Sequence, residues 1–139
     1  MKHNLILRLI AKYLFPVIAL FAFYVQFHGD YGPGGGFQAG VILSVAFIFY
    51  TLIFGLKTTE EILPPSLLRL LASSGVLIYA GTGVVTMAMG ENFLDYDPLS
   101  TAPAAGQHLG ILVIELGVGI TVSSVMLMIF YAFAGRGRP

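Results

Sequence analysis

The chain has 139 residues, of which 57% are hydrophobic and only 10% are charged, and its mean hydropathy is +0.87. Soluble domains carry about a quarter charged residues, so this composition excludes an ordinary water-soluble protein and predicts an integral membrane protein. The net charge is zero, and cysteine is absent, which excludes disulfides, thiolate metal sites and cysteine nucleophiles. No basic patch suited to nucleic acid is present. We expect residues 1–139 to form a single transmembrane domain.

Four apolar segments are long enough to cross a bilayer as helices. A span needs about twenty apolar residues, and the segments that meet this requirement are roughly Leu9–Phe27, Phe37–Leu56, Leu67–Met89 and Leu109–Ala134. Because lipid offers no hydrogen bonds to irregular backbone, the sequence predicts an all-α fold, an integral membrane bundle of four transmembrane helices. The first segment lacks an Ala-x-Ala-like cleavage site, so we expect a retained span rather than a signal peptide.

The positions of lysine and arginine predict the orientation of the bundle. All seven basic residues precede or open the first span, flank the connection between the second and third spans, or follow the fourth: Lys2, Arg8, Lys12, Lys57, Arg69, Arg136 and Arg138. The other two connections contain acidic residues and neither lysine nor arginine. By the positive-inside rule, we expect both termini and the middle connection in the cytoplasm.

The residues His28-Gly-Asp-Tyr-Gly-Pro-Gly-Gly-Gly-Phe-Gln-Ala-Gly40 form a glycine-rich stretch between the first two spans, and they include six of the seventeen glycines. A soluble protein could use such residues to bind phosphate, but here there is no Gly-Lys-Ser/Thr ending and no preceding strand. Glycine permits positive φ and close backbone approach. Loop backbone at this depth is tolerated where protein covers it. We therefore expect a turn at the outer membrane surface that a neighbouring subunit covers.

Glu115 is the acidic residue that lies deep in a predicted span, about six residues or roughly 9 Å past the start of the fourth segment. A charged carboxylate at that depth costs several kcal/mol unless it is solvated, paired or protonated. It is either a site on a proton or sodium path, or a carboxyl group bonded to a neighbouring helix or subunit. His108 precedes it by two helical turns and shares its face. This histidine is either part of a relay from the outer surface or a plain interfacial residue.

Three further groups are candidates near the outer surface. His28 and Asp30 lie at the outer mouth beside the glycine-rich stretch, without the third ligand that a metal site needs, so we predict no metal and no cofactor. Gln38 opens the second span, where its amide could cap backbone groups or contact a partner. The acidic segment Glu91–Gln107 is either a solvated connection or a vestibule that concentrates cations.

Taken together, these features resemble the B subunit of the Mrp-type (Mnh) multisubunit sodium/proton antiporters of bacteria. The resemblance covers nearly the whole chain and is carried by Pro33, Gly34, Gly35, Gly36, Phe37, Gln38 and Gly40, and by the run Gly106-Gln-His-Leu-Gly-Ile-Leu-Val-Ile-Glu-Leu-Gly-Val-Gly119. Members often have histidine after the first glycine of the motif, where this chain has Asp30. Glu115 matches the acidic position of the family's last span.

The resemblance implies a subunit, not itself an enzyme, of a hetero-oligomeric complex in the bacterial plasma membrane. Such complexes use the proton-motive force to exchange cytoplasmic Na⁺ for external H⁺. The implied partners are the other antiporter subunits and the lipid bilayer, and the implied role is assembly together with an ion pathway. Candidates for that pathway are Glu115, His108, Asp30 and His28. The competing interpretation is a purely structural membrane subunit of a related energy-converting hydrogenase or oxidoreductase.

Overall fold

The computed structural model describes residues 5–29 and 32–136, and within these ranges it contains helices and no strand. The elements are α1 (Leu5–Phe27), α2 (Gly36–Phe54), α3 (Leu56–Ile62), α4 (Pro65–Ala88), the 3-10 turn η1 (Asp97–Leu99) and α5 (Pro103–Ala134). Four of them, α1, α2, α4 and α5, are long and apolar enough to cross a membrane. The predicted all-α bundle with four spanning helices is confirmed.

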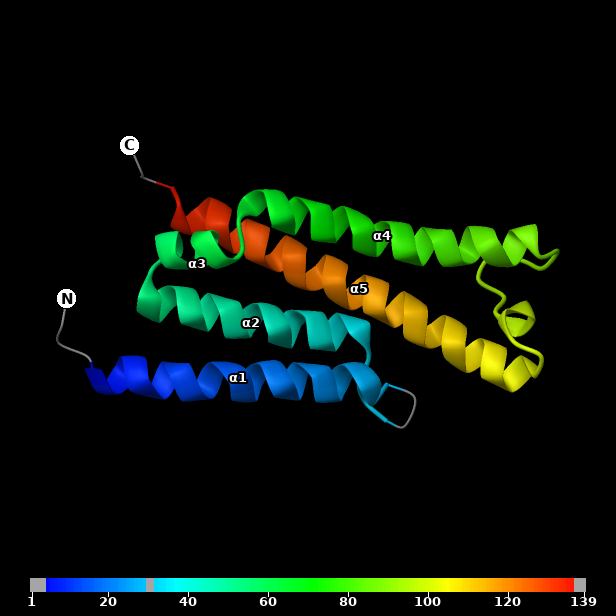
Figure 1. Ribbon diagram of the computed structural model, residues 1–139, viewed down its shortest axis with the longest axis horizontal. Helices are drawn as coiled ribbons and strands as arrows, with labels where there is room; N and C mark the ends of the chain where they lie inside the picture. The colour runs from blue at the N-terminus through cyan, green and yellow to red at the C-terminus, as the bar shows by residue number, and fades with distance from the viewer. Residues whose placement is uncertain (1–4, 30–31, 137–139) are drawn as a thin grey trace.

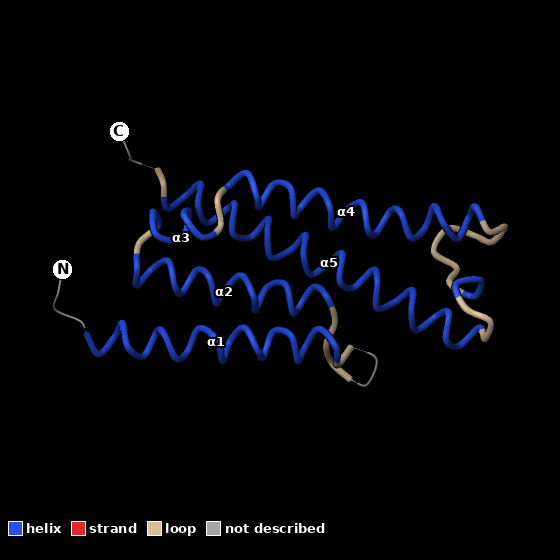
Figure 2. The backbone as a smooth tube through the Cα atoms, viewed as in Figure 1, coloured by secondary structure: helices blue, strands red, loops and turns tan. Residues whose placement is uncertain are grey.

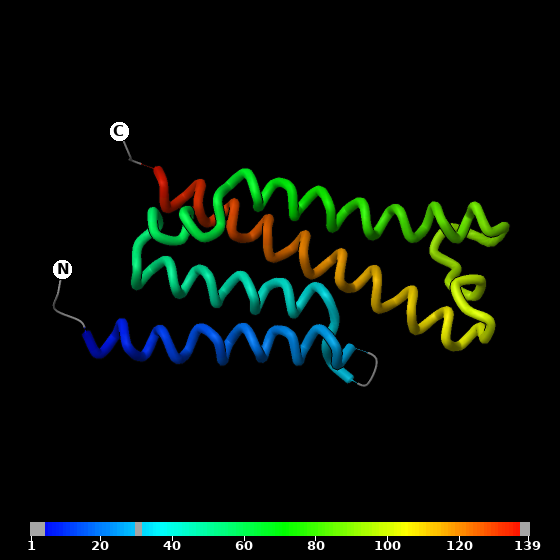
Figure 3. The backbone as a smooth tube through the Cα atoms, viewed as in Figure 1, coloured from blue at the N-terminus to red at the C-terminus, as the bar shows by residue number. Residues whose placement is uncertain are grey.

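The four long helices lie side by side in the order α1, α2, α5, α4 (Figure 1). The last helix in the chain therefore lies in the middle of the bundle, as the colour sequence of Figure 3 shows. The start of α1 and the end of α5 lie at one end, which we call the basic end. Its basic residues are Arg8, Lys12, Lys57, Arg69 and Arg136. The opposite, acidic end is closed by residues 89–102, the acidic connection.

The α1–α2 hairpin is staggered against the α4–α5 pair. Figure 1 shows α4 and α5 continuing well past the turn of the hairpin toward the acidic end. The first residue of α2 packs on Glu115, which follows the start of α5 at Pro103 by twelve residues. At 1.5 Å per residue this is about 18 Å. Because α5 begins before the predicted fourth span, Glu115 lies about twice as far along its helix as the sequence indicated.

Glycine pairs form the two crossings that place α5 between its neighbours. A Cβ atom at Gly117 would lie 2.8 Å from the carbonyl oxygen of Gly75 on α4, and a Cβ atom at Gly40 on α2 would lie 2.7 Å from the carbonyl oxygen of Gly119. Two residues turn a helix by about 200°, so Gly117 and Gly119 face opposite sides of α5. Close backbone packing through small residues is how helices associate in lipid. These two crossings therefore fix the stagger of the α1–α2 hairpin against the α4–α5 pair.

At the basic end, α3 folds back against the bundle through side-chain hydrogen bonds. Gly55, with φ +97°, lets the chain turn sharply between α2 and α3. The Thr51 hydroxyl donates to that of Thr59 at 3.0 Å, and the Tyr131 hydroxyl donates to the Leu63 carbonyl at 3.3 Å. Nearby, Tyr131 belongs to a buried cluster with Leu68 and Leu127. This end is the better packed part of the bundle core.

Candidate functional site

Before α2 begins, the described residues of the glycine-rich stretch, 28–29 and 32–35, pack on the last turn of α1 at the end of the hairpin (Figure 2, tan). The backbone N–H groups of His28 and Gly35 both donate to the carbonyl oxygen of Val25, at 3.3 and 3.0 Å. Gly35 has φ +109° and ψ 175°, a conformation that is essentially restricted to glycine. The turn thus sets the start of α2 directly beside the end of α1.

Glu115 of α5 packs onto this turn. A Cβ atom at Gly29 would lie 2.9 Å from both carboxylate oxygens, and one at Gly35 would lie 2.8 Å from Oε1. A Cβ atom at Gly36 would overlap the main-chain carbonyl oxygen of Glu115. These positions therefore need glycine to admit the carboxylate and its helix. Over these three glycines the cover is α5 of the same chain, where the sequence led us to expect a neighbouring subunit.

The Glu115 carboxylate lies at the N-terminal end of α2. Gly35 is the N-cap of that helix and, as glycine, has no side chain with which to cap its first N–H groups. The positive end of a helix dipole favours negative charge. The Gln38 amide oxygen lies nearby, 3.7 Å from the Cβ position at Gly35. Carboxylate and amide oxygens bind hard cations, and a carboxylate also accepts a proton. We call the place where Glu115 meets Gly29, Gly35, Gly36 and Gln38 the junction. The junction therefore has groups that can bind a cation or a proton.

The junction lies level with the middle of α4. Gly117, two residues after Glu115, contacts Gly75, which follows the start of α4 by ten residues and precedes its end at Ala88 by thirteen. These spacings correspond to about 15 and 20 Å. Glu115 is thus far from both ends of a helix that is long enough to span a membrane. Glu115 also lies beside the end of α1 and the start of α2. Ionisable groups inside a helix that can span a membrane are expensive and commonly mark ion pathways.

Of the other ion-path candidates, the structure describes His108 and His28. His108 is exposed and lies seven residues before Glu115, about 10 Å toward the acidic end. His28 adjoins Gly29, but its ring stacks on Tyr24 with centroids 5.0 Å apart. Asp30 lies outside the described residues. The structure therefore joins Glu115 to the glycines and leaves His108 two turns away.

Gln26 belongs to the same junction and was missed in the sequence. It is only 8% exposed, and its Oε1 lies 2.6 Å from the Cβ position at Gly119, one turn from Glu115. The available signal was its residue type, because Gln26 is the one amide within residues 5–27. Only the packing of α1 near α5 reveals that it is buried.

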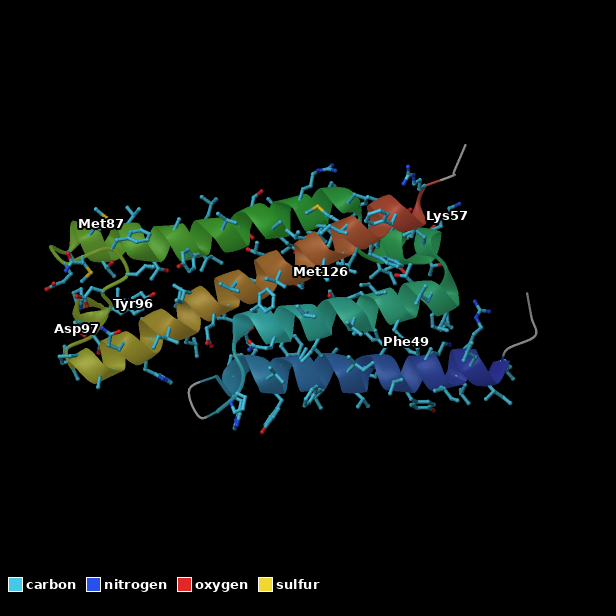
Figure 4. The ribbon with its side chains drawn as sticks, turned by 180° about the vertical axis from the view of Figure 1, so that it is seen from behind. Phe49, Lys57, Met87, Tyr96, Asp97 and Met126 are labelled. Carbon is cyan, nitrogen blue, oxygen red and sulfur yellow. The ribbon has the colours of Figure 1, made fainter. Side chains whose placement is uncertain are left out.

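The acidic connection packs on α5 through Tyr96, while most of its other residues are exposed. Tyr96 is buried, with its ring against Gly110, and burial raises the pKa of its phenol. The Gln107 amide donates to Asp97 at 2.8 Å and to Asp95 at 3.4 Å. Figure 4 shows Tyr96 and Asp97 beside the start of α5. The two carboxylates are thereby tied to the start of that helix.

The sequence also matches a known family over most of its length. Residues 6–128 match the family model described as "Domain related to MnhB subunit of Na+/H+ antiporter". The chain belongs to the MnhB family. Relatives from Staphylococcus aureus strains Newman, JH1 and COL, each named "Putative antiporter subunit mnhB2", are 35% identical to it over 139 residues. The alignment covers 97% of this chain and 98% of each relative.

The match to the MnhB family includes both parts of the junction, because the glycine-rich stretch and Glu115 fall inside residues 6–128. The resemblance inferred from the motifs is confirmed. With its four apolar helices, this MnhB-family chain is a multi-pass protein of the bacterial plasma membrane.

Proposed function

We propose that this MnhB-family chain is a membrane subunit of a multisubunit sodium/proton antiporter, and that Glu115 and the glycine-rich stretch line part of its ion route. The observation that carries the proposal is the position of the Glu115 carboxylate. It packs against Gly29 and Gly35 at the start of α2, level with the middle of α4. One carboxylate does not make a complete two-ion exchanger, so the other subunits supply the remaining groups.

The test replaces Glu115 with Gln in the complete antiporter complex. Glu115→Gln keeps the size of the side chain and removes its ability to carry charge. We expect the complex to assemble at the wild-type level, measured on blue-native gels, while Na⁺-driven proton movement in everted vesicles is lost. Glu115→Asp is the matched control and should retain part of the activity. Full antiport in the assembled Glu115→Gln complex would refute the ion-route role.

A purely structural role is the alternative, because the same contacts join α5 to the hairpin. Gly36 lies against the Glu115 main chain rather than its carboxylate, so Gly36→Ala should prevent assembly under either role. Gly81→Ala in α4 is the control, since nothing lies within 4 Å of its Cβ position. If the role is only structural, Glu115→Gln will leave antiport intact, whereas Gly36→Ala will still abolish the complex.

The proposed orientation places the basic end in the cytoplasm, as the positive-inside rule requires. The chain contains no cysteine, so a single introduced thiol reports its own position. Ser100→Cys in the acidic connection should react in intact cells with a membrane-impermeant maleimide. Thr58→Cys in α3, which is exposed at the basic end, should react after the cells are opened. The reverse labelling pattern would overturn the orientation.

A further inference from the structure

A cavity of about 90 Å³, open on one side, lies between α1, α2 and α5, and it extends along α5 from Leu116, next to Glu115, to Ser123 toward the basic end. Its walls include Gly40 and Leu43 of α2, and Ile120 and Ser123 of α5. Gln26 of α1 also lines it. One water needs roughly 10–15 Å³ of such space, so the cavity has room for water beside Gln26 and Ser123, while the rest of its lining is apolar.

The Gln26 amide is the polar group in the cavity wall that calls for a hydrogen-bonding partner. Gln26 is only 8% exposed, and it lines the cavity. A buried amide must exchange its lost water for other partners, or folding pays the full desolvation cost. Lipid tails and apolar side chains cannot provide those partners. The cavity is the space from which Gln26 can recruit them.

Polar groups then follow one face of α5 away from Glu115. Glu115, Gly119 and Ser123 are spaced four residues apart, about 6 Å per step, and Gln26 packs against the middle position. The Ser123 hydroxyl donates to the Ile120 carbonyl at 3.1 Å, which leaves its oxygen lone pairs for another donor. Because the two hydrogen bonds of one water meet at an angle, a pair of ordered waters with bonds of about 2.8 Å is needed to span a step of this length.

We propose that this cavity is a water site, in which the Gln26 amide and the Ser123 hydroxyl hold ordered water that extends the ion route from Glu115 toward the basic end. The inference rests on the proposed function, because it assigns the route a direction and its next polar groups. Gln26 and Ser123 act here by holding water, and the Glu115 carboxylate remains the group that carries charge.

The experiment uses the complete complex with two kinds of variant. Gln26→Met keeps the length of the side chain and removes its hydrogen-bonding groups. Ser123→Val and Ser123→Thr have the same size as each other, and only the threonine keeps the hydroxyl. We expect Gln26→Met and Ser123→Val to lower the antiport rate per assembled complex about tenfold, or about 1.4 kcal/mol. Ser123→Thr should stay near the wild-type rate.

A second readout separates water from packing. If the water chain is interrupted, proton transfer limits the rate, so the ratio of antiport rates in H₂O and D₂O should rise in Gln26→Met and Ser123→Val only. Equal rates and equal ratios in Ser123→Val and Ser123→Thr would overturn the water site, and this pair decides the matter even if Gln26→Met fails to assemble. A lipid tail or partner side chain filling the cavity in a map of the complex would overturn it too.

These outcomes are distinguishable from failure of the proposed function. If Glu115→Gln abolishes antiport while Ser123→Val matches Ser123→Thr, the Glu115 route stands and the water site is wrong. If Glu115→Gln leaves antiport intact, the proposed function fails, and the water site loses its role with it.

Discussion

In two regions of this molecule, glycine lets a bulky side chain lie against the backbone. The side chain is an ionisable carboxylate in one region and an aromatic ring in the other. In the junction, Gly29 and Gly35 leave space for the carboxylate of Glu115. At the acidic end, Gly110 leaves space for the ring of Tyr96. The first contact holds an ionisable group beside the middle of α4, and the second buries an aromatic ring near the end of the bundle.

The two regions differ in how easily the neighbouring atoms can move when a side chain is added to the glycine. Tyr96 lies in an irregular connection, whose side chain and backbone can both shift. The partners of the glycine-rich stretch are different, because Gly36 meets the main chain of α5 and Gly35 has a φ of +109°. A close contact between two backbones cannot be relieved by a rotamer change. The junction should therefore be the less tolerant region.

After the loss of assembly expected for Gly36→Ala, the largest effect in this comparison is expected at Gly35. Gly35→Ala adds a side chain where only glycine is comfortable, at a cost of about 1–3 kcal/mol, and also pushes a methyl group onto the Glu115 carboxylate. Gly55→Ala is the matched control, because Gly55 has a similar φ of +97° and nothing within 4 Å of its Cβ position. Thermal unfolding and antiport of the purified complex should suffer more in Gly35→Ala. Equal losses would mean that backbone strain alone explains the glycine.

A smaller effect is expected at Gly110. Gly110→Ala places a methyl group in the space of the Tyr96 ring, and overpacking of this kind costs about 1–3 kcal/mol, with the low end expected because the connection can move. The unfolding temperature of the complex should fall, while antiport per assembled complex should match wild type. A selective loss of antiport would place the acidic end on the ion route and remove the contrast between the two regions.

The smallest effect concerns pH. Burial, followed by the charge of Tyr79, raises the pKa of Tyr96 above its ordinary value of 10.0. The folded chain then holds the phenol proton more tightly than the unfolded chain, so this stabilisation is complete below pH 10 and is lost as pH rises through the folded pKa. Wild type should lose unfolding temperature above pH 10 more steeply than Tyr96→Phe. Identical slopes for the two proteins would show that Tyr96 does not contribute.

Much of the fold could be predicted because it depends on local properties of the chain. The apolar lengths predicted four spanning helices, and the glycine-rich stretch together with the run around Glu115 indicated the family. Glu115 stood out because a carboxylate inside an apolar run needs an explanation. Each of these signals lies within a few dozen residues and needs no knowledge of which helices touch.

The contacts between helices could not be read in this way. In the sequence, the glycine-rich stretch and Glu115 are separate features with separate roles, and nothing indicates that Gln26 is buried. Their meeting depends on Gly119 facing α2 while Gly117 faces α4. The glycines on both sides of α5 do not indicate which neighbouring helix each one contacts. In a membrane both the lipid-facing and the packed sides of a helix are apolar, so the apolar pattern does not distinguish them.

The sequence by itself determined the class of protein, its four helices and its family, because hydropathy, helix length and motif residues are properties of consecutive positions. Only the tertiary structure decided that Glu115 packs on the glycine-rich stretch and that Gln26 is buried against Gly119, one turn away. That outcome follows from the stagger of the α1–α2 hairpin against α4–α5. The stagger is set by backbone contacts between glycines far apart in the chain, which take effect only when the helices pack.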